Sequence, residues 1–216
     1  MNIRKFLSRY KGRYLKSLRS KYSEDLKAYF SDNPTIISNN CLAGFVYQDT
    51  GTPYTSPTIG MYFFFPDYIE FLSDLRTNLY ADLTFTDVSK YELGNERIKK
   101  AKHKYPIGLL NNSMEIHFLH YSSREEALEK WKRRLERVNL NNLIVLGTQL
   151  DLCTENDIKA FDQLDFEKKI FFTRDDYNTK SGVFIEAFKK SIKIGDPYQS
   201  GHILYKHLIK KVKNKA

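Results

Sequence analysis

The chain has 216 residues, 41% of them hydrophobic, and its 15 Phe, 15 Tyr and one Trp suffice for a sizeable core, which argues against global disorder. No apolar run approaches the roughly 18 residues that a transmembrane helix needs. The net charge of +9 lies at the two ends, since residues 1–22 contain eight Lys or Arg and no acid and residues 206–216 contain five Lys; the mildly acidic body between them argues against a nucleic-acid partner.

The cysteines and histidines indicate neither a disulfide framework nor a metal centre. Cys41 and Cys153 are too few for a set of disulfides or a structural zinc site. The five histidines show no metal-ligand spacing. The first residues are basic but lack the apolar core of a secretory signal. We therefore expect a cytoplasmic protein with no metal and no bound cofactor.

Residues 1–22 are predicted to form a basic amphipathic helix, and we expect residues 1–30 to stand apart from a single α/β domain at residues 31–216. The apolar positions recur mostly at steps of three and four: Ile3, Phe6, Leu7, Tyr10, Tyr14, Leu18 and Tyr22. Such a helix either lies on a membrane surface or packs its apolar stripe against the body. The lack of acids before Glu24 favours an anionic surface, at the inner face of the membrane.

Short apolar strands and helices alternate along the rest of the chain. Strands are predicted at 35–38, 81–87, 105–110, 114–121, 142–148, 169–173 and 183–188. Helices are predicted from Asp67, at 124–138, from Thr154 and at 199–213, and a long loop is predicted at 39–60. Asn111-Asn112 is typical of a tight turn. This alternation indicates a Rossmann-like α/β fold, with a mostly parallel sheet and helices on both faces.

Ligands of such sheets bind beyond the carboxyl ends of the strands. Three predicted strand ends have reactive or polar side chains: Ser38-Asn39-Asn40-Cys41, His120-Tyr121 and Gly147–Cys153. If the three strands are parallel, these segments meet at one edge of the sheet. We expect Cys41 to act as a nucleophile, His120 as its base and Asp151 as the group that orients the histidine. Oxyanion and binding groups would come from Ser38, Asn39 and Asn40.

Each of these residues also has a structural interpretation. Cys41 could be a small buried residue, and Asn39-Asn40 could supply turn geometry. His120 could bond a backbone carbonyl, and Asp151 could begin a helix. Hydroxyls and aromatic faces suited to a sugar are expected at Tyr54, Ser56, Thr58 and Tyr121, although the first three also suit an exposed turn. The basic run 130–137 is either a solvated helix face or a phosphate contact.

The order of motifs resembles an uncharacterised bacterial family, the domain of unknown function 1919. The resemblance covers residues 34–177 and rests on SNNC-LAG, YTSPTIGMYFFFPDYIEFLSDL, YPIGLL and HYSSREEALEKWKRRLERVNLNNLIVLGTQLD. It implies a role in capsule or exopolysaccharide biosynthesis. Ala43 replaces a glycine of the family pattern, which narrows the space beside the cysteine. TIISNNC is also similar to a strand-Gly-Asn-Cys signature of polysaccharide acyltransferases, with Asn39 in place of the glycine.

Together these features predict a transferase that moves an acetyl group to a sugar hydroxyl. Acyl-coenzyme A would be the donor, and a carbohydrate or lipid-linked sugar the acceptor. Two alternatives remain open at this point. One is a glycosyl- or phosphoryltransferase of the same pathway, and the other is a non-catalytic sugar-binding or scaffold subunit.

Overall fold

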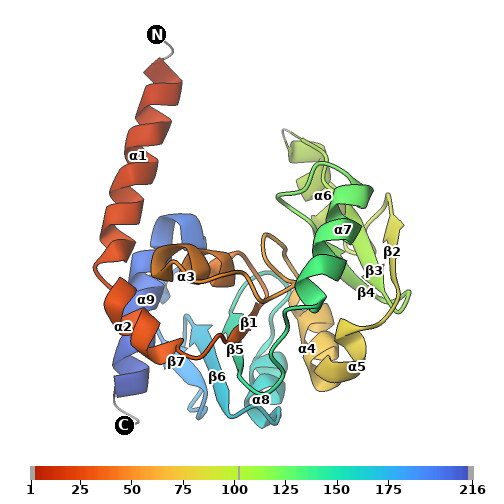
Figure 1. Cartoon of the computed structure of the whole chain (residues 1–216). Helices are drawn as coiled ribbons and strands as arrows, with labels where there is room; N and C mark the ends of the chain where they lie inside the picture. Colours follow the sequence, from red (N-terminus) through yellow and green to blue (C-terminus); the bar gives the residue numbers. More distant parts are fainter. Residues whose placement is uncertain (1–2, 102, 214–216) are drawn as a thin grey trace.

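The computed structural model describes residues 3–101 and 103–213 and contains two sheets (Figure 1). Sheet A is wholly parallel, and its strands occur in the order β1 (Thr35–Ser38), β5 (Leu143–Thr148), β6 (Lys168–Thr173) and β7 (Gly182–Phe184). Ile36 pairs with Ile144, and Leu146 pairs with Ile170, so the buried residues of neighbouring strands are in register. The predicted α/β fold with a mostly parallel sheet is confirmed.

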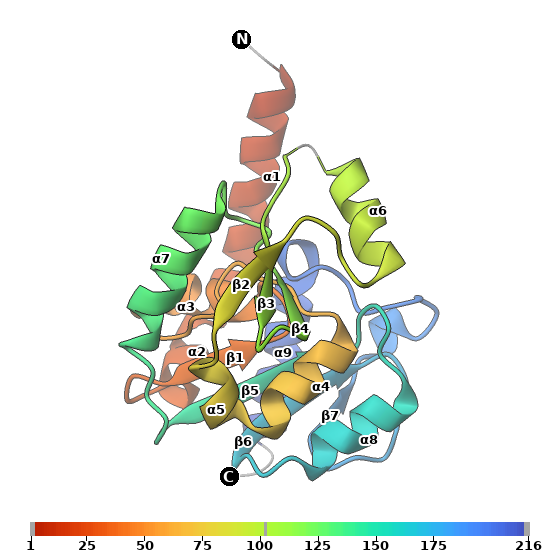
Figure 2. The same cartoon turned by 90° about the vertical axis from the view of Figure 1, so that its right-hand side faces the viewer.

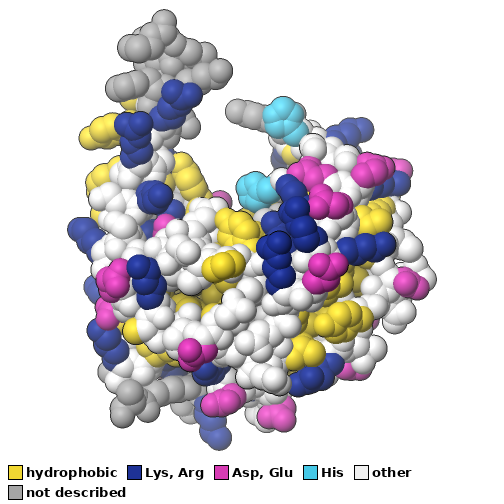
Figure 3. All heavy atoms as spheres, in the orientation of Figure 1, with side chains coloured by type: hydrophobic (Ala, Val, Ile, Leu, Met, Phe, Trp, Pro, Cys, Tyr) yellow, Lys and Arg dark blue, Asp and Glu magenta, His cyan; other side chains and the backbone are white. Residues whose placement is uncertain are grey.

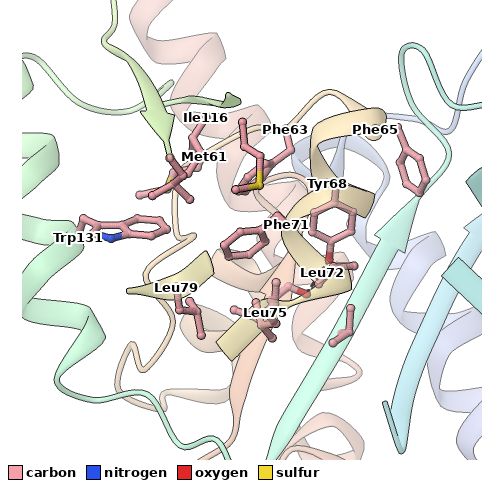
Figure 4. Close-up of a cluster of buried hydrophobic side chains, with 14 of the residues drawn as sticks. Met61, Phe63, Phe65, Tyr68, Phe71, Leu72, Leu75, Leu79, Ile116 and Trp131 are labelled. Carbon is pink, nitrogen blue, oxygen red and sulfur yellow. Dashed lines mark hydrogen bonds between the residues drawn. The ribbon is translucent and has the colours of Figure 1, made fainter. Parts of the chain in front are cut away.

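Helices cover both faces of sheet A because successive side chains of each strand point to opposite sides. On one face, Ile36 and its neighbours pack against three helices, α2 (Ser23–Tyr29), α3 (Leu42–Thr50) and α9 (Pro197–Lys213). On the other face, Ile37 and its neighbours pack against α4 (Phe65–Ser73), α5 (Leu75–Leu79) and α8 (Glu155–Gln163). Figure 4 shows Tyr68 and Phe71 of α4 in this second core, with Trp131 of α7 (Arg124–Leu135) at its side.

A second sheet, which the sequence analysis did not separate from the first, lies beyond α4 and α5 (Figure 2). Its three strands are antiparallel, in the order β2 (Leu83–Thr86), β3 (Ile107–Leu110) and β4 (Met114–His117). Asn111 and Asn112 have φ of 49° and 57°, which confirms the predicted turn between β3 and β4. Helices α6 (Glu92–Lys100) and α7 flank this sheet in Figure 2.

The prediction of a continuous loop at 39–60 is wrong, because α3 lies within it. Its residues are mostly buried, so the segment has no polar face from which a helical period could be recognised. Gly51 ends the helix with φ of 71°, a conformation that glycine adopts without strain.

Three other elements differ from their predictions. Asp67 does not cap a helix, since α4 begins at Phe65, and the buried Asp67 instead forms an ion pair with Lys90 at 2.6 Å. The helix predicted from Asp67 ends before Asp74, whose side chain accepts a hydrogen bond from Thr77 N and caps the separate helix α5. The strand predicted at 183–188 is divided into β7 and the 3₁₀ helix η1 (Glu186–Phe188).

The basic N-terminal helix is present as α1 (Ile3–Ser20), but a different side of it is buried. Leu15 and Arg19 are buried, whereas Leu7, Tyr10 and Tyr14 of the predicted apolar stripe are 58%, 68% and 57% exposed. The side chains of Ile3 and Phe6, which also belong to that stripe, lie outside the described part of the structure. Within the described residues, no helix has the length and apolar character needed to cross a membrane.

Candidate functional site

The end of β1 and the start of α3 form the centre of the candidate site. Ser38 Oγ accepts a hydrogen bond from Ala43 N at 3.3 Å, and Asn40 Oδ1 accepts one from Leu42 N at 2.9 Å. These two side chains satisfy N–H groups of the first helical turn, which have no partner within a helix. Cys41 follows Asn40 and is the N-cap residue of α3, so the local sequence places its thiol where the strand passes into the helix.

The two asparagines before the thiol have different environments. Asn39 is fully buried, and its amide joins β1 to β5 by donating to Thr148 O at 2.9 Å and accepting from Thr148 N at 3.1 Å. Asn40 is 4% exposed, and its Nδ2 has no hydrogen-bond partner among the described residues. Asn40 therefore supplies the amide N–H donor that is available beside Cys41, whereas the amide of Asn39 is bonded to the backbone of Thr148.

The thiol of Cys41 contacts the imidazole of His120, with Sγ and Nε2 separated by 3.4 Å. The two residues meet although β4 is not part of the parallel sheet. Tyr62 and His117 exchange backbone hydrogen bonds of 2.9 Å, which directs the chain after β4 toward the end of β1. Gly60, which lies beside His120, has φ of 74°, a left-handed conformation that glycine adopts without strain.

Cys41 lies between two surface hollows. The first has a volume of about 270 Å³, and we call it the Asp151 hollow; it is lined by Asn40, Cys41, Tyr62, Arg97, Tyr105, Leu119, Leu150, Asp151, Lys193, Ile194, Asp196 and Pro197. The second has a volume of about 320 Å³, and we call it the Arg134 hollow; it is lined by Cys41, Gly44, Phe45, Gln48, Tyr54, Ile59, Gly60, His120, Tyr121, Lys130 and Arg134. A molecule in either hollow would reach the thiol.

Asp151 lies in the same hollow as Cys41 but does not contact the imidazole. It accepts hydrogen bonds from Tyr62 Oη at 2.8 Å, from Lys193 Nζ at 3.0 Å and from Arg97. Burial alone would raise the pKa of Asp151, but the charges of Arg97 and Lys193 and the bonds to the carboxylate outweigh burial and lower it. Among the described residues no hydrogen bond joins Asp151 to His120, so the expected contact between them is corrected.

The thiol of Cys41 is protonated at neutral pH. Burial, together with the negative charge of Asp196, raises the pKa of Cys41 to about 12. A nearby base must therefore remove the proton before the sulfur can attack, and the exposed His120 is in contact with it. With Nε2 of the imidazole unprotonated, the S–H group donates to this nitrogen.

The four residues expected to contact a sugar divide into two groups. Tyr54 and Tyr121 line the Arg134 hollow, and the Tyr121 hydroxyl donates to Ile59 O at 2.6 Å. Ser56 and Thr58 are fully buried, and their hydroxyls bond each other at 3.0 Å. The expectation that these two hydroxyls face a substrate is corrected, because each satisfies the other inside the protein.

Several charged residues of the site were not identified from the sequence. Arg97 of α6 and Lys193 before α9 line the Asp151 hollow, and no local pattern marks them, since their partner Asp151 is distant in the chain. Lys130 and Arg134 lie in the basic run 130–137, for which a phosphate contact was one of the two interpretations. Figure 3 shows Lys and Arg side chains gathered over α7.

Comparison with known proteins assigns the chain to a family. The model of the family described as "Domain of unknown function (DUF1919)" matches residues 13–215. The chain belongs to this family. An uncharacterized protein of Haemophilus influenzae is 37% identical to it over 166 residues, which is 76% of this chain and 74% of that protein. The matched DUF1919 region includes Cys41, His120 and Arg134, whereas the first turns of α1 precede it.

Proposed function

We propose that this DUF1919 protein is an acyltransferase that moves an acetyl group to a sugar hydroxyl in the biosynthesis of a surface polysaccharide. The observation that supports this most directly is the 3.4 Å contact between Cys41 Sγ and His120 Nε2, at the junction of two hollows. The pathway comes from the family resemblance described above, and the chemistry comes from the pair of side chains.

The reaction has two half-steps that share the same base. In the first, His120 takes the thiol proton while Cys41 Sγ attacks the thioester carbonyl of an acyl-coenzyme A. The coenzyme A sulfur leaves with that proton, and a new thioester remains on Cys41. In the second, His120 takes the proton of the sugar hydroxyl as its oxygen attacks this thioester, and Cys41 leaves as a thiol. Asn40 Nδ2, which is buried and has no partner in the described part of the chain, would donate a hydrogen bond to the oxyanion of each half-step.

The proposal predicts a covalent acyl-enzyme that is detectable by mass. Incubation with acetyl-coenzyme A should add one acetyl group to the intact protein, on the peptide that contains Cys41. Cys153→Ala should keep the adduct, and Cys41→Ala should lose it. Both thiols are protonated at neutral pH, but among the described residues only Cys41 has a hydrogen-bonding contact with an imidazole. An adduct on Cys153 would contradict the assignment, and the absence of any adduct would exclude acetyl-coenzyme A as the donor.

We also propose that α1 holds the enzyme at an anionic membrane surface, near a lipid-linked acceptor. Leu7, Tyr10 and Tyr14 are exposed on α1. The described part of this helix also exposes Arg9, Lys11, Arg13 and Lys16. Figure 3 shows hydrophobic and basic side chains together along it. Aromatic and basic side chains on one helix suit the headgroup region of a bilayer.

Sedimentation with lipid vesicles tests this attachment. The protein should bind vesicles that contain phosphatidylglycerol and not vesicles of phosphatidylcholine alone, and binding should weaken as salt rises. The double variant Tyr10→Ser/Tyr14→Ser should bind less. Tyr80→Ser is the matched control, since Tyr80 is similarly exposed, at 59%, on another part of the molecule. Equal binding to both kinds of vesicle would contradict the proposal.

A further inference from the structure

Arg134 of α7 is a buried cation that has no acidic partner among residues 3–101 and 103–213. Only 9% of its surface is exposed, and its Nη1 donates to two neutral oxygens, Ile59 O at 3.2 Å and the Tyr121 hydroxyl. Within the described part of the chain, no carboxylate forms an ion pair with it. Buried charges are normally paired, because an unpaired charge loses its hydration without compensation.

Another buried arginine of this protein, Arg19, has an acidic partner. Arg19 is 4% exposed, and its guanidinium forms an ion pair with Asp49 at 2.6 Å. Arg134 is buried almost as deeply, but the described residues offer it no such carboxylate. Its bonds all use Nη1, so the edge formed by Nε and Nη2 is without a protein acceptor among the described residues.

An anionic ligand in the Arg134 hollow could supply the negative charge that Arg134 needs. Arg134 and Lys130 both line it, and no Asp or Glu is among its lining residues. Lys130 forms an ion pair with Glu126, and its Nζ lies 5.3 Å above the ring of Tyr121. The hollow therefore has an excess of positive charge beside the thiol and imidazole of the proposed reaction.

We propose that the Arg134 hollow binds the diphosphate of the acceptor, a sugar that is joined through this diphosphate to a nucleoside or a lipid. The planar guanidinium suits a phosphate, which it can bind through two parallel hydrogen bonds. Cys41 and Arg134 border the same hollow of about 320 Å³, so a phosphate bound by Arg134 lies near the reacting sulfur. This proximity favours the acceptor over the donor as the source of the phosphate. Coenzyme A has its diphosphate at the far end of the pantetheine arm from its sulfur. A sugar diphosphate has it on the ring that bears the reacting hydroxyl.

Binding of the anion can be measured on the full chain without any acyl transfer. At constant ionic strength, inorganic pyrophosphate and uridine diphosphate should raise the thermal midpoint progressively with concentration. Arg134→Gln should weaken this binding at least tenfold. Arg133→Gln is the matched control, because Arg133 is its neighbour on α7, half-exposed and paired with Glu129 at 3.1 Å. Should Arg134→Gln not fold, Lys130→Gln tests the site instead, because Lys130 is the other cation that lines the Arg134 hollow.

The assignment of the phosphate to the acceptor rests on the proposed function. The experiments below distinguish a failure of the proposed acyl transfer from a failure of the anion site. Pyrophosphate binding is measured without an acyl donor, so a protein that binds pyrophosphate but transfers no acetyl group keeps the anion site and loses only the proposed reaction. Binding of coenzyme A that depends on Arg134 and exceeds that of uridine diphosphate would overturn the acceptor assignment. Pyrophosphate binding that is absent, or unaffected by Arg134→Gln and Lys130→Gln, would overturn the site itself.

Discussion

Replacing His120 by alanine is expected to slow acylation of Cys41 by about 10²- to 10⁴-fold, the usual contribution of a positioned general base. The size of the effect follows from the state of the thiol. Because the pKa of Cys41 is raised to about 12, almost no thiolate exists at neutral pH, and the thiolate is the reactive form. The variant should also become strongly dependent on pH, its rate rising about tenfold per pH unit as hydroxide replaces the missing base.

The measurement needs no knowledge of the natural donor. Single-turnover reaction with p-nitrophenyl acetate reports acylation through the release of nitrophenolate. His103→Ala, which removes another exposed histidine, should react as the wild type does. Because His120 is exposed, added imidazole should restore part of the rate to His120→Ala and none to Cys41→Ala. A His120→Ala rate equal to that of the wild type would show that Cys41 reacts without this base.

The pairing of Cys41 with His120 was predicted from the sequence on the assumption that both residues follow strands of one parallel sheet, and this assumption holds only for Cys41. The rule that ligands bind beyond parallel strand ends places Cys41 correctly, after β1. His120, however, follows β4 of the antiparallel sheet, and the bridge between Tyr62 and His117 brings it to the site. An isolated bridge between distant segments has no local pattern, so sequence periodicity could not reveal it.

Polar residues near the site were harder to interpret than apolar ones. Apolar burial is visible in the strands as runs without polar positions, and those strands were predicted well. The burial of Asn39, Ser56 and Thr58 depends on partners that satisfy them, which are Thr148 for the asparagine and each other for the two hydroxyls. Composition alone cannot distinguish a hydroxyl that binds a ligand from one that bonds a neighbour inside the protein.

Arg19 illustrates the same difficulty with a charged residue. In the sequence it belongs to the basic side of an amphipathic helix. In the structure it turns inward and forms an ion pair with Asp49 of α3, whose side chain is 1% exposed and also accepts a hydrogen bond from the Tyr205 hydroxyl of α9 at 3.1 Å. Gly201 of α9 permits this, since a Cβ there would lie 2.7 Å from Arg19 Cδ. The pair thus fixes the last turn of α1 against α3 and α9.

Arg19→Leu should therefore lower the free energy of unfolding by about 3–5 kcal/mol, because it leaves the carboxylate of Asp49 buried and without its cation. The double variant Arg19→Leu/Asp49→Leu should lose less than Arg19→Leu alone, since no uncompensated charge remains. Urea unfolding followed by circular dichroism measures both, and Arg13→Leu, which removes an exposed arginine of α1, is the control. A loss below about 1 kcal/mol for Arg19→Leu would match an exposed ion pair and contradict this account. A double variant less stable than Arg19→Leu would mean that Asp49 stabilises α3 and α9 through the Tyr205 hydroxyl more than its burial costs.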